Sequence, residues 1–204
     1  MDKTLNVLLS LDGGQGRDVV DAIASTGRDY RLFSFEEAGR SPFGTLHALK
    51  DLGTTTDADY FIARRLDDVA REIRDGQLRD LVLSQVIHAH AYISPHAELG
   101  QNTFVGAKAV VNPQARLGDF VFVNAGCLID HDCVIGSGTS LGPGVTFPGF
   151  VSIGEHCAIG AGVVARPGVT VAPGCTLGAG AVIARDITEP GVYIGNPAHP
   201  LERK

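Results

Sequence analysis

Residues 123–142 read VNAGCLIDHDCVIGSGTSLG, and in this stretch an aliphatic residue returns at every sixth position. The same step, followed in both directions, gives sixteen apolar positions between Ile93 and Ile183. Two residues before each of them stands a small or β-branched residue, as Cys127 stands before Ile129. Alternate side chains of a strand share one face, so each pair is typical of a short strand with two inward side chains.

A six-residue unit is too short to bury its own inward residues, so successive units must wind and stack to form a continuous core. Three units per turn give a triangular prism of about five coils, in which residues eighteen apart lie above one another at about 4.8 Å. The residue after the aliphatic one is usually glycine or asparagine, which tolerate corner geometry best. The pattern therefore predicts a parallel β-helix over residues 93–183.

Cysteines are confined to this repeat, at Cys127, Cys133, Cys157 and Cys175. All four occupy the small inward position, and no two of them have the C-x-x-C spacing of a metal or redox site. We therefore expect them to be core residues that behave as small apolar side chains.

The composition of the 204-residue chain limits its partners. The net charge is −6 and no run of basic residues occurs, which weighs against nucleic acid or an anionic membrane surface and favours a small-molecule substrate. Twenty-six glycines and an aromatic content of 6% suit a solenoid with many tight corners. No stretch approaches the roughly 18 apolar residues of a membrane span, and the first residues lack a signal-peptide apolar region, so we expect a cytoplasmic protein.

Residues 1–85 follow a different pattern, in which apolar runs of strand length alternate with helical runs. Strands are expected at residues 4–11, 30–35, 60–62 and 81–83, and a helix at 66–74. A loop at 12–16 precedes another helix, whose apolar face we expect to carry Val19, Val20, Ile23 and Ala24. This alternation predicts a small Rossmann-like parallel α/β sheet.

The loop Gly14-Gln15-Gly16 is a candidate phosphate site, because glycines there let main-chain amides and a helix N-terminus approach an anion. Glu36 and Glu37, at the end of the second strand, have the position of acids that bind a ribose or a base edge. The spacing alone equally allows a tight turn without a ligand, because the full dinucleotide fingerprint is absent.

One repeat unit departs from the glycine corners, because Ile129 is followed by Asp130, His131 and Asp132. His131 comes two residues after an inward position, so we expect it at an outward corner. A histidine can act as a general base near neutral pH, and a neighbouring carboxylate can fix its tautomer. The alternative is a surface histidine between solvated acids. The cluster has no recognised metal-ligand spacing, so we expect no metal.

Specific motifs recur from one end of the chain to the other. They are Gly14-Gln15-Gly16, the junction Ile87-His88 followed by Ile93-Ser94-Pro95, the segment NAGCLIDHDCVIG at 124–136 and the ending GVYIGNPA at 191–198. In these motifs the chain resembles the bacterial nucleotide-sugar acetyltransferases of the bacillosamine-pathway N-acetyltransferase and sialic acid O-acetyltransferase type. The resemblance implies a left-handed β-helix, a homotrimer, and acetyl-CoA bound in the groove between two prisms.

The same resemblance implies roles for individual residues. His131 would be the general base, Asp132 would assist it, and Asn124 would contact the substrate. The nucleotide would be held by Gly14, Gln15, Gly16, Glu36 and Glu37. Acetyl-CoA would be contacted by Ser140, Gly142, Gly149, Ala161 and Ala179.

Spacing gives two of these assignments separate support. Gly149 is eighteen residues after His131, and Ala179 is eighteen after Ala161, so each pair should stack. An N–H near Gly149 would then stabilise the thioester oxyanion.

The chain departs from the family at Leu11, Gln15 and Ser140. It also departs at Arg64-Arg65, where relatives have Gly-Asn.

These expectations predict an acetyl-CoA-dependent acyltransferase that acetylates the amine of a nucleotide-linked amino sugar, in the biosynthesis of a cell-surface glycan or glycoconjugate. The expected domains are a nucleotide-sugar-binding domain at 1–85, a β-helix acyltransferase domain at 86–188 and a tail near the CoA site at 189–204. A hydroxyl acceptor, as on a sialic acid, and a different acyl group are alternatives. A non-catalytic hexapeptide-repeat protein that binds a partner or a metal is a third reading, because the repeat supplies fold and not function.

Overall fold

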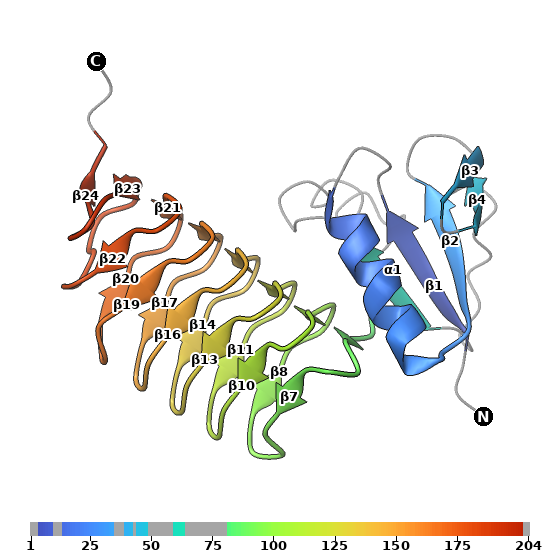
Figure 1. Cartoon of the computed structure of the whole chain (residues 1–204), viewed down its shortest axis with the longest axis horizontal. Coiled ribbons are helices and arrows are strands. Elements are labelled where there is room, and N and C mark those ends of the chain that lie inside the picture. Colours follow the sequence, from blue (N-terminus) through green and yellow to red (C-terminus); the bar gives the residue numbers. More distant parts are fainter. Residues whose placement is uncertain are drawn as a thin grey trace. The chain divides into compact units, whose positions relative to one another are not determined.

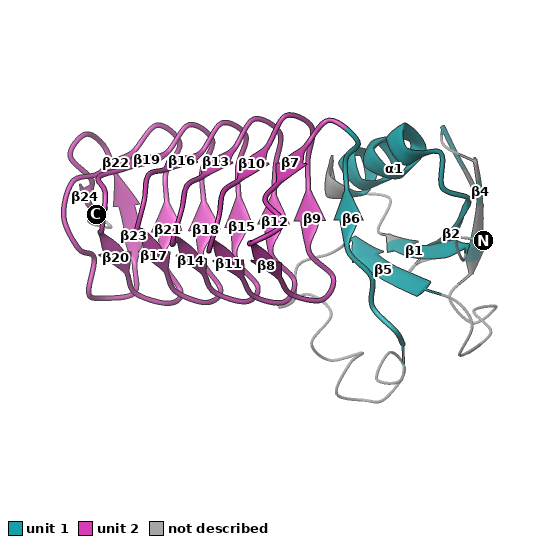
Figure 2. Cartoon of the chain, turned by 90° about the horizontal axis from the view of Figure 1, so that it is seen from below, with its two compact units in different colours: residues 1–89 teal, residues 90–204 magenta. Residues whose placement is uncertain are grey.

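The chain divides into two compact units, Met1–Ala89 and His90–Lys204, which Figure 2 distinguishes by colour. The structure, a computed structural model, describes residues 4–9, 14–34, 39–42, 44–48, 59–63 and 81–201. The first unit is α/β and the second is a solenoid of short strands.

The first unit contains a five-stranded sheet of order β3-β4-β2-β1-β5, with the helix α1 beside it (Figure 1). The elements are β1 (Leu5–Leu9), α1 (Gly14–Thr26), β2 (Tyr30–Ser34), β3 (Gly39–Ser41), β4 (Gly44–Ala48), β5 (Asp59–Ala63) and β6 (Val86–Ile87). Strands β4, β2, β1 and β5 are parallel, and β3 is antiparallel to β4. The predicted parallel α/β sheet is therefore confirmed.

Several details of this unit differ from the prediction. Strands β3 and β4 were not predicted, because their residues lack a continuous apolar run. Of the strand predicted at 81–83, only Leu83 pairs, in a bridge to Tyr60. The helix predicted at 66–74 lies outside the described residues.

Helix α1 begins at Gly14, so Gly14-Gln15-Gly16 form its first turn, and the prediction of a loop over these residues is wrong. Its buried side chains include Val19, Val20, Ala22 and Ile23. The prediction that Ala24 shares this face is also wrong, because five steps of about 100° rotate it roughly 140° away from Val19 into solvent.

The second unit winds sixteen two-residue strands, β7 to β22, into a left-handed parallel β-helix with three faces. The first face consists of β7 (Tyr92–Ile93), β10 (Val110–Val111), β13 (Leu128–Ile129), β16 (Thr146–Phe147), β19 (Val164–Ala165) and β22 (Val182–Ile183). The second face consists of β8 (Glu98–Leu99), β11 (Arg116–Leu117), β14 (Val134–Ile135), β17 (Ser152–Ile153) and β20 (Thr170–Val171). The third face includes β9 (Phe104–Val105), β12 (Phe122–Val123), β15 (Ser140–Leu141), β18 (Ala158–Ile159), β21 (Thr176–Leu177), β23 (Val192–Ile194) and β24 (His199–Pro200).

The register of these strands follows the repeat. In the strand pairs from β7 through β22 the strands are parallel and the paired residues are eighteen positions apart; Val110, for example, pairs with Leu128. This spacing confirms the predicted period. From the six-residue repeat that contains Val105 onward, both inward side chains of every repeat are buried. In the repeats of Ile93 and Leu99 they are partly exposed, because β7 and β8 are the edge strands of the first and second faces.

The four cysteines are free and buried in the small inward position, as predicted. Their thiols donate to main-chain carbonyls, for example Cys127 Sγ to the Gly142 oxygen at 3.2 Å. The Thr139 hydroxyl donates in the same way to the Gly154 oxygen at 2.9 Å. Burial raises the pKa of all four thiols, that of Cys127 to about 11, which disfavours the reactive thiolate.

The glycines that follow the aliphatic positions serve the close packing of coils. A Cβ added to Gly136 would lie 2.5 Å from the nitrogen of Glu155 on the next coil. The left-handed residue comes two positions later, as at Gly138, where φ is +70°. The first glycine of a corner is therefore required by close approach, and not by the backbone angle that the sequence suggested.

The end of the chain continues the solenoid. Strand β23 pairs in parallel with β21, and β24 pairs antiparallel with β23, so residues 192–200 extend the third face. The described part of the chain contains no helix with both the length and the apolar character of a membrane span.

Candidate active site

His131 lies at the corner between the first and second faces, two residues after the end of β13. Ile129 is buried in the core and Asp132 has a φ of +59°, so the chain turns here and His131 remains exposed. Aspartate is among the residues that adopt this left-handed backbone most readily after glycine. Residues 130–132 and, one coil later, 148–150 are called the histidine corner below.

The imidazole of His131 is held by the neighbouring carboxylate. Its Nδ1 lies 2.9 Å from Oδ2 of Asp132, and the two side chains are 48% and 43% exposed. With the carboxylate accepting from Nδ1–H, Nε2 carries the lone pair that can take up a proton. The two residues thus have the arrangement of a general base and the acid that orients it.

Asp130 fixes the main chain of the corner. Its Oδ1 accepts hydrogen bonds from Nδ2 of Asn112, on the preceding coil, and from the N–H of His131, each at 2.8 Å. The Asn112 bond, followed by that from His131, lowers the pKa of the Asp130 carboxyl below its ordinary value. Sequence reasoning missed this contact, although Asn112 stands eighteen residues before Asp130 and the repeat stacks such residues.

Replacing Asn112 with alanine should raise the pKa of Asp130 toward its ordinary value. A lowered folded-state pKa stabilises the fold above the unfolded-state pKa, and this contribution is lost as the pH falls through the folded-state pKa. The variant should therefore be less stable than the wild type near neutral pH, by no more than about 1 kcal/mol because the carboxylate is partly exposed. Thermal unfolding between about pH 3 and pH 7 measures the difference, which should shrink in acid; a difference that grows there would contradict the assignment.

The next coil covers one side of the imidazole. A Cβ added to Gly149 would lie 2.5 Å from Cε1 and 2.6 Å from Nε2 of His131, so the ring rests on this glycine, as the spacing of eighteen predicts. The Phe150 N–H donates to the His131 carbonyl at 3.1 Å. The Phe150 ring meets the imidazole edge-on, with centroids 5.1 Å apart at 87°. Sequence reasoning did not identify Phe150.

Apart from Gly149, the residues predicted to bind acetyl-CoA lie on another corner, between the third and first faces. A Cβ added to Gly142 would lie 2.6 Å from the nitrogen of Ala161, and one added to Gly160 would lie 2.5 Å from the nitrogen of Ala179. These residues therefore stack on successive coils, as the spacing predicts. Ser140 comes two residues before Gly142, in β15.

Asn124 also belongs to this corner, one coil before Gly142. Its Nδ2 donates to the Leu141 oxygen at 2.7 Å. Residues 124–126, 142–144, 160–162 and 178–180 are called the asparagine corner below.

The two corners lie at opposite ends of the first face. Asn124 and His131 are seven positions apart and flank β13, Asn124 on the corner before this strand and His131 on the corner after it. The structure therefore brings His131, Asp132 and Gly149 together within one chain, but it does not bring Asn124 to His131.

The predicted nucleotide site is described only in part. Gly14-Gln15-Gly16 begin α1 shortly after the carboxyl end of β1, where main-chain amides of a helix can bind a phosphate. Glu36 and Glu37 lie outside the described residues, as do Arg64 and Arg65.

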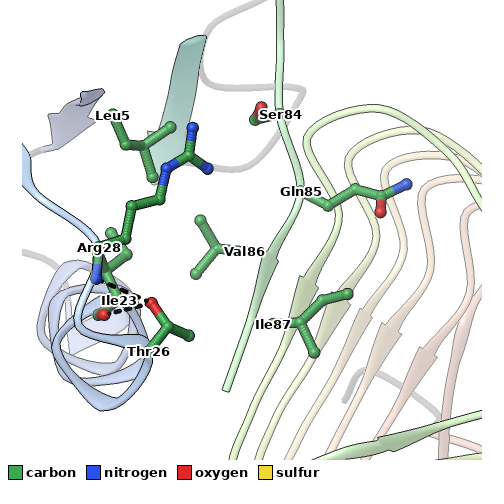
Figure 3. A pocket seen from close by; sticks show the side chains of 8 residues that line it. All are labelled: Leu5, Ile23, Thr26, Arg28, Ser84, Gln85, Val86 and Ile87. Atoms are coloured by element: carbon green, nitrogen blue, oxygen red, sulfur yellow. Dashed lines mark hydrogen bonds between the residues drawn. The ribbon is translucent and has the colours of Figure 1, made fainter. Parts of the chain in front are cut away.

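A cavity of about 370 Å³ lies at the other end of β1 and α1 (Figure 3). It is lined by Leu5, Ile23, Thr26, Arg28, Ser84, Gln85, Val86 and Ile87. The Arg28 guanidinium pairs with Asp59, and the Arg28 N–H donates to Thr26 Oγ1 at 3.4 Å. None of the residues predicted to bind the nucleotide lines this cavity, which lies at the C-terminal end of α1. Among the described residues, no group of three His, Cys, Asp or Glu side chains is arranged to bind a metal ion.

Comparison with known proteins gives the family. The family model "Bacterial transferase hexapeptide (six repeats)" matches residues 114–149 and 150–185. No curated protein sequence matches the chain. The acetyltransferase domain of PglB from Neisseria gonorrhoeae FA1090 is 32% identical, with a TM-score of 0.87 over 98% of this chain and 100% of that chain, and its structure is also known in complex with acetyl coenzyme A.

PerB from Caulobacter crescentus, in complex with CoA and GDP-perosamine, is 27% identical, with a TM-score of 0.84 over 98% of this chain and 97% of that chain. These matches span both units, and the PglB domain is about one third identical over its whole length. The chain therefore belongs to the hexapeptide-repeat family of nucleotide-sugar acetyltransferases, and it is an acyl-CoA-dependent acyltransferase.

Proposed function

We propose that the protein transfers the acetyl group of acetyl-CoA to the amine of a nucleotide-linked amino sugar, with His131 as the general base. The observation that carries this proposal is the 2.9 Å contact between His131 Nδ1 and Asp132 Oδ2, which leaves Nε2 as a proton acceptor on an exposed corner. The complex of the PglB domain with acetyl coenzyme A and that of PerB with CoA and GDP-perosamine support the choice of donor and of acceptor class.

In the proposed reaction the acceptor amine attacks the thioester carbonyl while Nε2 of His131 takes its proton. The C–N bond forms, the C–S bond breaks, and the imidazolium returns the proton to the departing CoA thiolate, so no covalent acyl-enzyme is needed. Asp132 stabilises the imidazolium. The Gly149 N–H, which has no hydrogen-bond partner among the described residues, is the proposed donor to the oxyanion.

The nucleotide in this proposal binds at the start of α1. Main-chain amides of Gly14, Gln15 and Gly16 would contact the phosphates, and Glu36 and Glu37 would contact the ribose or the base. The position of the three residues in the first helical turn supports the phosphate contact.

The proposed active site lies between the subunits of a homotrimer. One chain holds His131 and the asparagine corner at opposite ends of the first face, on two different corners of the prism. The outward side chains of this face are mostly apolar, and Tyr92 and Val164 are 54% and 41% exposed. Three such faces packed around a threefold axis would join each histidine corner to the asparagine corner of the next chain. Acetyl-CoA would then contact Ser140, Gly142, Ala161 and Ala179 of that chain, near its Asn124.

A shared site predicts that two inactive variants restore each other. His131→Ala removes the base, and Ala161→Trp places a bulky side chain at an exposed position of the asparagine corner. The two variants are co-expressed with different tags, and trimers that contain both are purified through the two tags in turn. Each mixed trimer then contains one site with both corners intact, so about one third of wild-type activity should return. CoA release with acetyl-CoA and the nucleotide amino sugar measures it.

The matched control for this experiment pairs His131→Ala with Asp132→Ala. Both changes lie in the histidine corner, so no mixed site is intact and no activity should return. If mixed trimers of His131→Ala with Ala161→Trp showed no activity, both halves of the site would lie in one chain, and the proposal of a shared site would be wrong.

The acceptor is identified by CoA release with UDP-, GDP- and dTDP-linked amino sugars, compared with the same sugars carrying a hydroxyl in place of the amine. We expect turnover with the amines only. Turnover of the hydroxyl sugars or of free sialic acid would establish O-acetylation, and faster turnover with a longer acyl-CoA would establish a different acyl group.

A further inference from the structure

Phe150 combines an exposed apolar ring with a strained backbone. Its side chain is 62% exposed, and its φ is +66°, in the left-handed region that bulky residues rarely occupy. One coil later, the corresponding corner position is Gly168, with φ +73°, and a Cβ there would meet no atom within 4 Å. The fold thus accepts glycine at such a corner, and Phe150 is not needed to turn the chain.

The contacts of Phe150 are with His131. The Phe150 N–H donates to the His131 carbonyl, and its ring lies edge-on to the imidazole, in the arrangement that aromatic pairs prefer. His131 is thereby held at Nδ1 by Asp132, on one side by Gly149 and on another by Phe150. Asp132 alone is a weak restraint, because both partners of that hydrogen bond are nearly half exposed.

We infer that Phe150 is a positioning residue for the general base, whose ring keeps the imidazole of His131 against Gly149 with Nε2 directed at the acceptor amine. This inference rests on the proposed function. The left-handed backbone alone does not mark a functional site, because Phe120 and His156 have it at other corners of the β-helix; what distinguishes Phe150 is the contact of its ring with the imidazole. The Phe150 ring thereby keeps the imidazole from rotating out of its productive orientation between turnovers.

The test replaces Phe150 with glycine. Removal of the left-handed strain and of the exposed ring should raise the Tm by about 2–4 °C. The kcat for the nucleotide amino sugar should nevertheless fall about tenfold, because the imidazole samples unproductive orientations, while the KM for acetyl-CoA stays within about twofold of the wild type. Phe150→Tyr keeps the ring edge and should restore kcat.

Phe120 offers a matched control within the same repeat. Its φ is +56°, it is only partly buried, and it lies at the corner between the second and third faces, away from the histidine corner. Phe120→Gly relieves the same backbone strain and should leave kcat unchanged. A loss of activity in both variants would mean that softening any corner impairs the enzyme, which would overturn a specific role for Phe150.

Three other results would overturn the inference. Wild-type kcat in Phe150→Gly, with His131→Ala inactive, would show that the base needs no such support and would leave the proposed function intact. A raised KM for the sugar with unchanged kcat would make Phe150 an acceptor contact, and loss of the trimer in sedimentation velocity would make it an interface residue. If His131→Ala is itself active, the proposed function fails instead.

Discussion

Replacing His131 with alanine should lower kcat/KM for the nucleotide amino sugar by about 10²- to 10⁴-fold, the usual contribution of a general base. The variant keeps Asp132 and Gly149 but has no group to take the proton of the attacking amine. The lost side chain is 48% exposed, so the fold should be preserved and the Tm nearly unchanged. The measurement is CoA release at saturating acetyl-CoA, with thermal unfolding as a check on the fold.

His156→Ala is the control for this substitution. His156 is also an exposed corner residue of the β-helix, with φ +56°, but it lies between the second and third faces. Its replacement should leave kcat/KM unchanged. If His131→Ala retained most of its kcat/KM while its fold was intact, His131 would be a solvated surface residue and the base would have to be sought elsewhere.

The second large effect is expected from Gly149→Ala, which adds a single methyl group. That group would lie 2.5 Å from Cε1 and 2.6 Å from Nε2 of His131, closer than side-chain atoms approach in folded proteins, so the imidazole must move. A displacement of about 1 Å at a reacting group can cost on the order of 10²-fold in rate, and we expect kcat to fall by about that factor. Steady-state kinetics with the nucleotide amino sugar measures the fall.

Gly174→Ala separates this clash from backbone strain. Gly174 has φ +71° and lies on a corner away from His131, where the nearest atom to an added Cβ is 3.9 Å away. This control should lose about 1 kcal/mol of stability through strain and keep its activity. Gly149 is not in the left-handed region, so its alanine variant should show the opposite balance, with a small change in stability and a large loss of rate. Unchanged kcat in Gly149→Ala would mean that the contact with His131 has no catalytic role.

The β-helix could be predicted in detail because each coil contacts mainly its neighbours, so period and register are local properties of the sequence. The step of six identified both inward positions and explained the four cysteines, all of which are buried. The first unit was harder to predict, since a sheet of strands distant in sequence depends on packing and not on a repeat. Strands β3 and β4 show this, because neither has the alternation or the apolar run that marks a strand.

The sequence by itself determined the solenoid, its core and the stacking of Gly149 on His131, because a period of eighteen specifies which residues lie above one another. The tertiary structure decided which side chains meet at a corner. The sequence did not indicate that Asn112 binds Asp130 or that Phe150 faces the imidazole, and the structure shows both contacts. The period of eighteen already places Asn124 and His131 on different corners of the prism, but it carries no information about which side chains at one corner turn toward each other, because that depends on how the side chains of neighbouring coils pack.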